Sequence, residues 1–224
     1  MKKTLIGIIV AMFSFGSASA DAGVNIGLSG VGAIFGASAT ETDTGPDETE
    51  KVSDTDIMGA SYASFFIEKE LGMAFVGLDY VLNTLETEEA TSLQNDCTTT
   101  QQCGGGDVFT QVTNKVKVEF NDLTTLYAGI RLFDNFYAKA GVVSVDIDTK
   151  ENLGTGSTYG NTSMDGTMVG VGGQAELPNG MFIRAEANYL DFDGASVTSS
   201  TGVNKVEINS LDGLAAKISI GATF

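Results

Sequence analysis

The amino-acid sequence predicts an all-β fold: an eight-stranded antiparallel up-and-down transmembrane β-barrel with four long surface loops and three short periplasmic turns. Apolar residues after residue 20 recur with a period of two, which is typical of strands. Short turns alternate with long connections along the chain. Strands of 10 to 14 residues exceed the usual length and suit a tilted membrane crossing. A soluble β-sandwich would alternate too, but these lengths and the asymmetric loops favour the barrel.

The first twenty residues have the three parts of a secretory signal peptide. Lys2 and Lys3 are a basic start, residues 5–15 are an apolar run, and Ala18 to Ala20 provide small residues for cleavage. The alternative is a membrane-spanning helix, but the run is too short because a span needs about 20 residues. We therefore expect residues 1–20 to be a cleaved signal peptide and residues 21–224 to form the barrel.

Strand positions follow from the alternation and from the turn residues between strands. The expected strands are 24–38, 57–69, 73–82, 123–132, 136–147, 167–177, 181–192 and 211–224. Three of the connections are tight turns, namely Glu70-Leu71-Gly72, Phe133-Asp134-Asn135 and Pro178-Asn179-Gly180. The long connections are 39–56, 83–122, 148–166 and 193–210. Short turns at one end and long loops at the other are typical of an outer-membrane barrel.

The two faces of each strand should meet different surroundings. Large apolar and aromatic side chains in outward register should face lipid, including Phe65, Tyr80, Leu126, Phe136, Ile183 and Tyr189. Charged residues in inward register should form a lumenal charge network, namely Glu68, Glu70, Asp79, Arg131, Lys139, Glu176, Arg184, Glu186 and Lys217. Isolated buried charges are costly, so these should pair. One interpretation is that the network plugs the lumen with salt bridges and water. The other is that it acts as a gate, in which Arg and Lys side chains exchange carboxylate partners and briefly open a narrow path.

Composition excludes several kinds of activity. The chain has no His, which rules out Ser-His-Asp and Cys-His catalysis and His metal sites. Two Cys cannot build a four-thiolate site. The net charge of −17 argues against nucleic-acid binding, which recruits Lys and Arg. We expect neither an enzyme nor a cofactor.

Acidic residues gather around the long connections. Together with the bordering strand ends, the four connections carry net charges of −6, −5, −3 and −2. One interpretation is a hydrated, soluble face. The other is recruitment of divalent cations such as Ca²⁺ or Mg²⁺ by clustered carboxylates. Because no connection has EF-hand spacing, the sequence assigns no metal ligands.

Cys97 and Cys103 lie in the second long connection, with five residues between them. In an exported chain two close Cys should form one disulfide, which would close a small surface loop. The alternative is a pair of free reactive thiols.

Two segments carry a resemblance to known proteins. One is the terminal Ile218-Ser219-Ile220-Gly221-Ala222-Thr223-Phe224, which together with the signal peptide and eight strands looks like a bacterial outer-membrane β-barrel protein. The other is Phe136-Tyr137-Ala138-Lys139-Ala140-Gly141, which resembles the strand after a periplasmic turn in the OmpA-like and opacity-protein barrels. The resemblance implies a Gram-negative outer membrane with the loops at the cell surface. It also implies that Ile218, Ile220 and Phe224 belong to a C-terminal signal read by the barrel-assembly machinery. Because nothing follows Phe224, the peptidoglycan-binding domain of OmpA is not expected and a cell-wall tether is not implied.

The expected partners are therefore the outer-membrane lipid bilayer, the assembly machinery, and an extracellular ligand or divalent cations at the loops. The expected function is non-enzymatic: envelope structure and the surface presentation of acidic loops for adhesion or recognition. The alternative is a narrow porin-like channel for small solutes or ions, gated by lumenal salt bridges.

Overall fold

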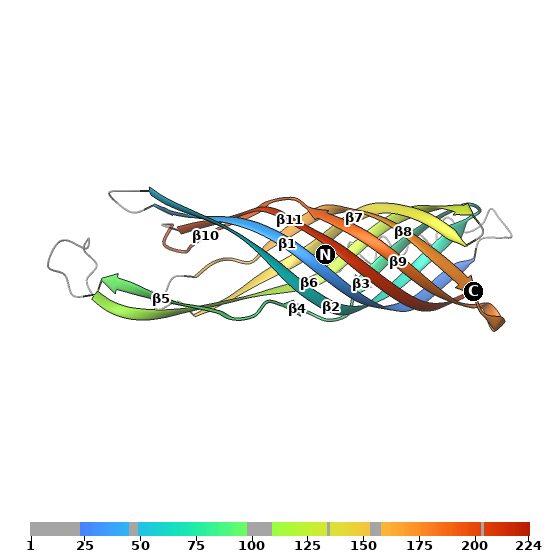
Figure 1. Cartoon of the computed structure of the whole chain (residues 1–224), viewed down its shortest axis with the longest axis horizontal. Coiled ribbons are helices and arrows are strands. Elements are labelled where there is room, and N and C mark those ends of the chain that lie inside the picture. Colours follow the sequence, from blue (N-terminus) through green and yellow to red (C-terminus); the bar gives the residue numbers. More distant parts are fainter. Residues whose placement is uncertain (1–22, 45–48, 98–108, 134, 153–157, 203) are drawn as a thin grey trace.

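The computed structural model describes residues 23–44, 49–97, 109–133, 135–152, 158–202 and 204–224, and these residues are almost entirely in strands (Figure 1). The elements in chain order are β1 (Val24–Thr44), β2 (Thr49–Leu71), β3 (Ala74–Val81), β4 (Leu85–Glu86), β5 (Ala90–Cys97), β6 (Phe109–Phe133), β7 (Phe136–Asn152), β8 (Thr162–Glu176), the 3-10 turn η1 (Pro178–Gly180), β9 (Met181–Phe192), β10 (Ala195–Thr198) and β11 (Asn204–Thr223). No helix in the described residues is long and apolar enough to cross a membrane.

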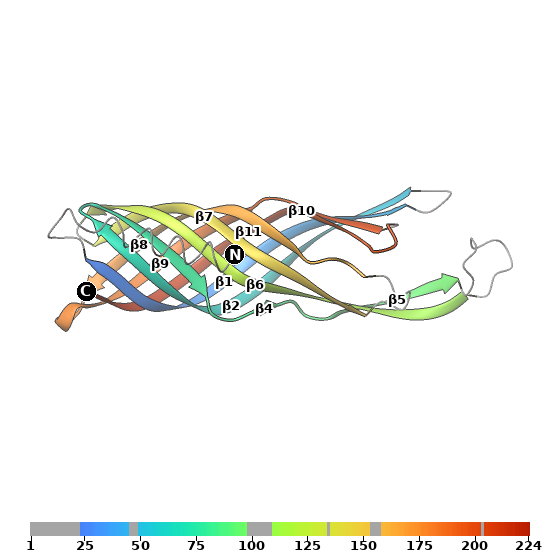
Figure 2. The same cartoon turned by 180° about the vertical axis from the view of Figure 1, so that it is seen from behind.

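Eight of the strands close into a ring. The order is β1-β2-β3-β6-β7-β8-β9-β11, every neighbouring pair is antiparallel, and β11 pairs back with β1. Following paired residues once around the ring from Gly27 leads back to β1 at Ala37, ten residues further on. This stagger is what tilts the strands of a closed barrel, as Figures 1 and 2 show. The predicted eight-stranded up-and-down barrel is confirmed.

Much of the chain that the sequence predicts to be loop is strand. The β1–β2 ladder continues to Thr44↔Thr49, β5 pairs with the first part of β6, and β10 pairs with β11. These ribbons extend the barrel at one end (Figure 1). Most of 39–56 and large parts of 83–122, 148–166 and 193–210 are therefore paired strand, which corrects the predicted boundaries. Thr and Val recur in these stretches, and both favour strands.

The opposite end has the predicted short turns. The β2–β3 turn contains Gly72 at φ +71°, and η1 joins β8 to β9 through Asn179 at φ 67° and Gly180 at φ 72°. Glycine and asparagine tolerate this left-handed region best. In the β6–β7 turn, Asp134 lies outside the described residues.

The outer wall is apolar, and aspartates border it on five of the eight barrel strands. Exposed apolar side chains cover it, including Leu28, Ile130, Val142, Val169, Val171, Leu214 and Ile218. Of the predicted lipid-facing residues, Phe136, Ile183 and Tyr189 are exposed, while Phe65, Tyr80 and Leu126 are half-buried beside their neighbours. At the end of the wall nearest the ribbons, five consecutive strands each carry an aspartate in outward register, namely Asp122, Asp146, Asp165, Asp191 and Asp212. We refer to these five residues as the aspartate ring.

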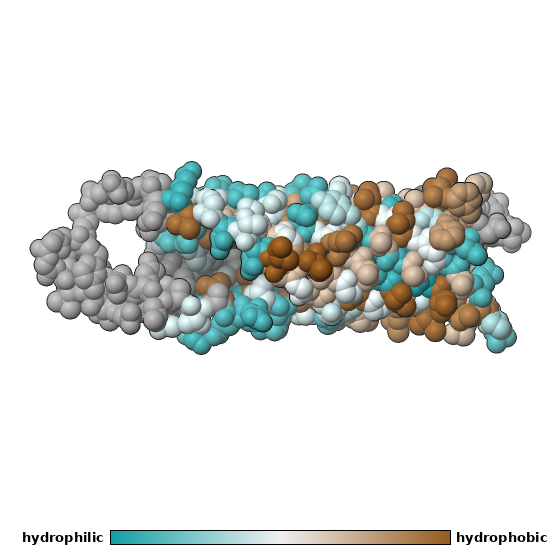
Figure 3. Space-filling model, viewed as in Figure 1, coloured by the Kyte–Doolittle hydropathy of each residue, from teal (hydrophilic) through white to brown (hydrophobic). Residues whose placement is uncertain are grey.

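Hydrophilic residues cover the ribbons beyond this ring, whereas apolar residues gather over the barrel wall (Figure 3). Closure satisfies the backbone groups that lipid cannot. A closed barrel with an apolar exterior is the outer-membrane type, which agrees with the expected location.

Candidate functional site: the barrel lumen

Arg184 and Glu68 form the first of three buried ion pairs inside the barrel. Arg184 Nη1 and Nη2 donate to the two Glu68 oxygens at 2.7 and 2.5 Å, and its Nε donates to Gln174 Oε1 at 2.6 Å. This fork geometry is the strongest form of such a pair. The guanidinium also lies 4.6 Å from the centre of the Phe182 ring. These contacts leave Arg184 only 6% exposed.

The second pair joins Lys139 to Glu186, with Nζ 2.8 Å from Oε1. Two tyrosines supply the carboxylates with further donors: Tyr137 donates to Glu186 at 2.5 Å and Tyr127 donates to Glu68 at 2.8 Å. Both rings are buried. The two pairs meet through these rings, because Lys139 Nζ lies 4.7 Å from the centre of the Tyr127 ring and the Arg184 guanidinium lies 5.6 Å from the centre of the Tyr137 ring.

Lys217 and Asp79 form the third pair, and the Ser64 hydroxyl donates to Asp79 at 3.2 Å. Beside it, the hydroxyls of Ser29 and Ser219 are 2.8 Å apart. The six buried charges are three carboxylates and three cations, so they cancel. The predicted charges at these six positions are all inward and mutually paired.

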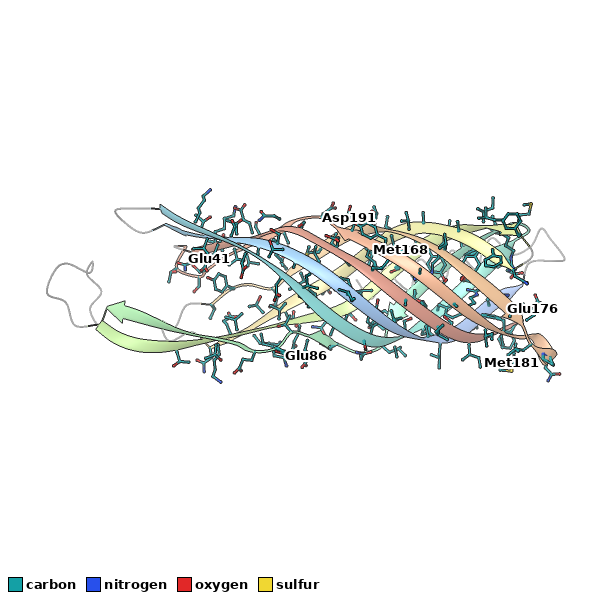
Figure 4. The ribbon with its side chains drawn as sticks, in the orientation of Figure 1. Glu41, Glu86, Met168, Glu176, Met181 and Asp191 are labelled. Carbon is teal, nitrogen blue, oxygen red and sulfur yellow. The ribbon has the colours of Figure 1, made fainter. Side chains whose placement is uncertain are left out.

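The remaining predicted network members lie nearer the short-turn end. Arg131 pairs with Glu70, which also accepts from Asn25 Nδ2 at 3.0 Å. This pair is only half-buried. The prediction that Glu176 joins the network is wrong: it is the last residue of β8, its side chain is exposed, and it has no partner among the described residues. Figure 4 places it at the end of the barrel away from the ribbons.

An apolar septum fills the lumen on the ribbon side of the charges. It consists mainly of Val31, Phe35, Val81, Leu123, Val143, Val145, Ile147, Met164, Met168, Leu190, Phe192 and Leu211. The sequence predicted charges in the lumen but not this apolar layer. The sequence signal for this layer is the adjacent pair Val142-Val143, because two neighbouring apolar residues in a strand place one apolar side chain outward and the other inward.

Only a small cavity separates the charges from the septum. Its volume is about 40 Å³, and Asp79, Lys139, Asn188 and Lys217 line it. Asn188 Oδ1 is buried there without a hydrogen-bond partner. Ligand sites occupy roughly 300–1,000 Å³. This cavity therefore has room for water but not for a solute.

Six inward aromatic rings each lie over a glycine on a neighbouring strand. The directly paired residues are Phe66 with Gly27, Phe35 with Gly213, Tyr127 with Gly77, Phe75 with Gly129, Tyr137 with Gly172 and Phe182 with Gly221. A Cβ built on any of these glycines would lie 2.2–2.6 Å from the ring. These six aromatic–glycine pairs account for part of the high glycine content and were not anticipated from the sequence.

The ribbons carry exposed ion pairs. Lys115 binds Glu89 at 2.6 Å and Lys117 binds Glu86 at 2.5 Å. The hydrogen bond to Glu86 raises the pKa of Lys117 above its ordinary value. No group of three or more acidic or Cys residues in the described chain is arranged to hold a metal ion. Recruitment of divalent cations stays a prediction.

The predicted disulfide and signal peptide lie wholly or partly outside the described residues. Cys97 ends β5, while Cys103 and residues 1–20 are not described. The disulfide can be tested by alkylating unfolded protein and measuring its mass. Without reductant we expect no alkylation; with reductant both thiols should react. Alkylation of both thiols without reductant would contradict the pairing.

The C-terminal residues close the seam of the barrel. Ile218 and Ile220 face outward and are exposed, and so is Phe224. The backbone groups of Phe224 exchange two 2.9 Å hydrogen bonds with Val24. A role for these three residues in assembly stays a prediction.

No protein-family model matches the chain, and no curated protein matches it. Solved structures with a similar fold are bacterial outer-membrane proteins. AlkL is 13% identical, with a TM-score of 0.49 and 93% of each chain covered. OprG from Pseudomonas aeruginosa is 14% identical, with a TM-score of 0.46 and coverage of 90% of this chain and 96% of its own. The protease OmpT from Escherichia coli is 11% identical, with a TM-score of 0.44 and coverage of 93% and 99%. This likeness concerns the fold alone.

Proposed function

We propose that this protein is a non-enzymatic outer-membrane barrel with a closed lumen, which stabilises the envelope and presents acidic ribbons at the cell surface for adhesion or recognition. The observation that carries the proposal is the lumen itself: three balanced ion pairs lie against a continuous apolar septum. A passing ion would have to displace both layers. The ribbons project beyond the aspartate ring and are the part best placed to meet a partner.

The residues also favour a non-enzymatic role. The chain contains no His to serve as a general base. The three buried carboxylates each accept from a cation and from a hydroxyl group, so each is engaged in the pairing inside the lumen. Carboxylates paired in this way favour a structural role over a catalytic one.

The alternative, a channel gated by the lumenal salt bridges, predicts a different electrical result. With refolded protein in planar bilayers, we expect no resolved conductance steps. Arg131→Ala and Lys139→Ala should also be silent, because the septum remains in place in both. Heat-dependent migration on gels would show that each sample is folded. Regular steps from the unsubstituted protein would contradict the closed lumen, and steps from Lys139→Ala alone would support the gate.

A further inference from the structure

A second, much larger cavity lies beyond the septum, at the ribbon end of the barrel. Its volume is about 730 Å³. The apolar side chains in its lining include Phe35, Met58, Leu85, Val118 and Phe120. Several of them pack against the septum, which forms the floor. The size and the apolar lining are those of a small-molecule binding site.

The cavity opens sideways between β2 and β4. Consecutive residues line it on both edges, 56–60 on one side and 85–89 on the other. On β2 these include Met58, which faces inward, and Ile57, which faces outward and is 73% exposed. A lining that includes both faces of one strand means that the cavity passes around the edge of that strand.

Strand pairing explains the opening. The β2–β3 ladder ends at Ser64↔Val81, and beyond it Ala63 makes two last bonds, accepting from Leu82 N–H at 2.9 Å and donating to Asn83 Oδ1 at 3.0 Å. Further along, β4 pairs with β6 instead of β2. In the described residues, no ladder joins β2 to β4 at this level.

The opening lies at the level where the apolar wall ends. Leu85 pairs with Phe120, two residues beyond Asp122 of the aspartate ring. The lower edge of the opening is thus level with the end of the apolar wall. A molecule partitioned into the outer surface of the bilayer would meet the opening directly, without passing through the ribbons.

The lining of the cavity carries acidic side chains. Four acids line the cavity, Asp56, Glu86, Glu88 and Glu89, and no Lys or Arg does among the described residues. Lysines of β6 neutralise Glu86 and Glu89. Asp56 and Glu88 have no ion-pair partner among the described residues. An apolar chamber with an anionic rim complements an apolar molecule that carries a positive charge at one end.

We propose that this cavity binds alkylammonium amphiphiles, with the alkyl chain among Met58, Leu85 and Phe120 and the cationic head at Asp56 and Glu88. The ligand enters sideways from the membrane surface, between β2 and β4. This binding is independent of the closed lumen, because the septum lies beneath the cavity. Binding and conductance can therefore succeed or fail separately.

The test is calorimetric titration of full-length mature protein in zwitterionic lipid nanodiscs, with empty nanodiscs as the blank. The probes are nonyltrimethylammonium and decanoate, which share a nine-carbon alkyl chain and differ in the sign of the head. We expect saturable heat with the cation and at least tenfold weaker binding of the anion. No heat above the blank with the cation, or equal binding of the two probes, would overturn the proposal.

Substitutions locate the site. Met58→Asn places an amide in the apolar lining and should weaken binding about tenfold, whereas Val52→Asn, on the same strand but outside the lining, should leave it unchanged. Leu85→Asn tests the opposite edge should Met58→Asn fail to fold. The double variant Asp56→Asn, Glu88→Gln should lower the ratio of the affinity for the cation to the affinity for the anion at least threefold. Unchanged binding in a folded lining variant would place the ligand elsewhere.

Discussion

Arg184→Ala should lower the free energy of unfolding by about 3–5 kcal/mol, because it leaves the Glu68 carboxylate buried inside the barrel without its cation. Glu68 is 1% exposed and keeps only neutral donors once the guanidinium is gone. The substitution also removes the bond to Gln174 and the contact with the Phe182 ring. Urea unfolding of protein refolded into lipid vesicles measures the loss.

Two controls separate burial from charge. Lys205→Met breaks an ion pair of similar length, 2.6 Å to Glu207, on the exposed ribbon, where water screens both groups. It should not measurably change stability. The double variant Glu68→Gln, Arg184→Met removes both buried charges and should be more stable than Arg184→Ala. If Arg184→Ala is no worse than Lys205→Met, the buried pair does not stabilise the fold.

Gly129→Ala should destabilise the barrel by about 1–3 kcal/mol through overpacking. Its Cβ would lie 2.2 Å from Phe75 Cζ, and that ring is held in edge-to-face contact with Tyr137. The ring therefore cannot move aside without disturbing the charge layer. The same urea titration measures the effect.

Gly32→Ala is the matched control, since Gly32 lies on β1 with no atom within 4 Å of the added methyl group. It should be neutral or slightly stabilising. Adding Phe75→Leu to Gly129→Ala should restore part of the loss by vacating the space. Equal effects of the two glycine substitutions would show that backbone entropy, not the ring, decides the outcome.

The sequence predicted the strands and their faces because each depends on local alternation. Lys217 and Ile218 are neighbours that face opposite sides, and period two is enough to say so. It could not predict that Lys217 pairs with Asp79, since that contact depends on the stagger of the whole ring. Glu176 is at an inward position of the alternation, but it lies at the end of its strand, where an inward position no longer implies burial.

The ribbons and the lateral opening escaped prediction for a related reason. Acidic, threonine-rich segments such as 39–44 are polar enough to read as loop, yet pairing with the other arm of the hairpin keeps them in strands. The opening exists because β3 ends at Val81 while β2 and β6 both continue. The end of one strand relative to its neighbours is a property of the closed sheet and not of any one segment.

The aromatic–glycine pairs have a consequence for how the strands find one another. Strands that slip by two residues keep their faces, so alternation alone does not detect the error. A slip between β3 and β6 would set Phe75 opposite Tyr127 or Arg131 instead of Gly129. The ring would then meet a side chain where it needs a gap. Six rings and six glycines, distributed around the wall, therefore favour the native register of the strands over registers shifted by two residues.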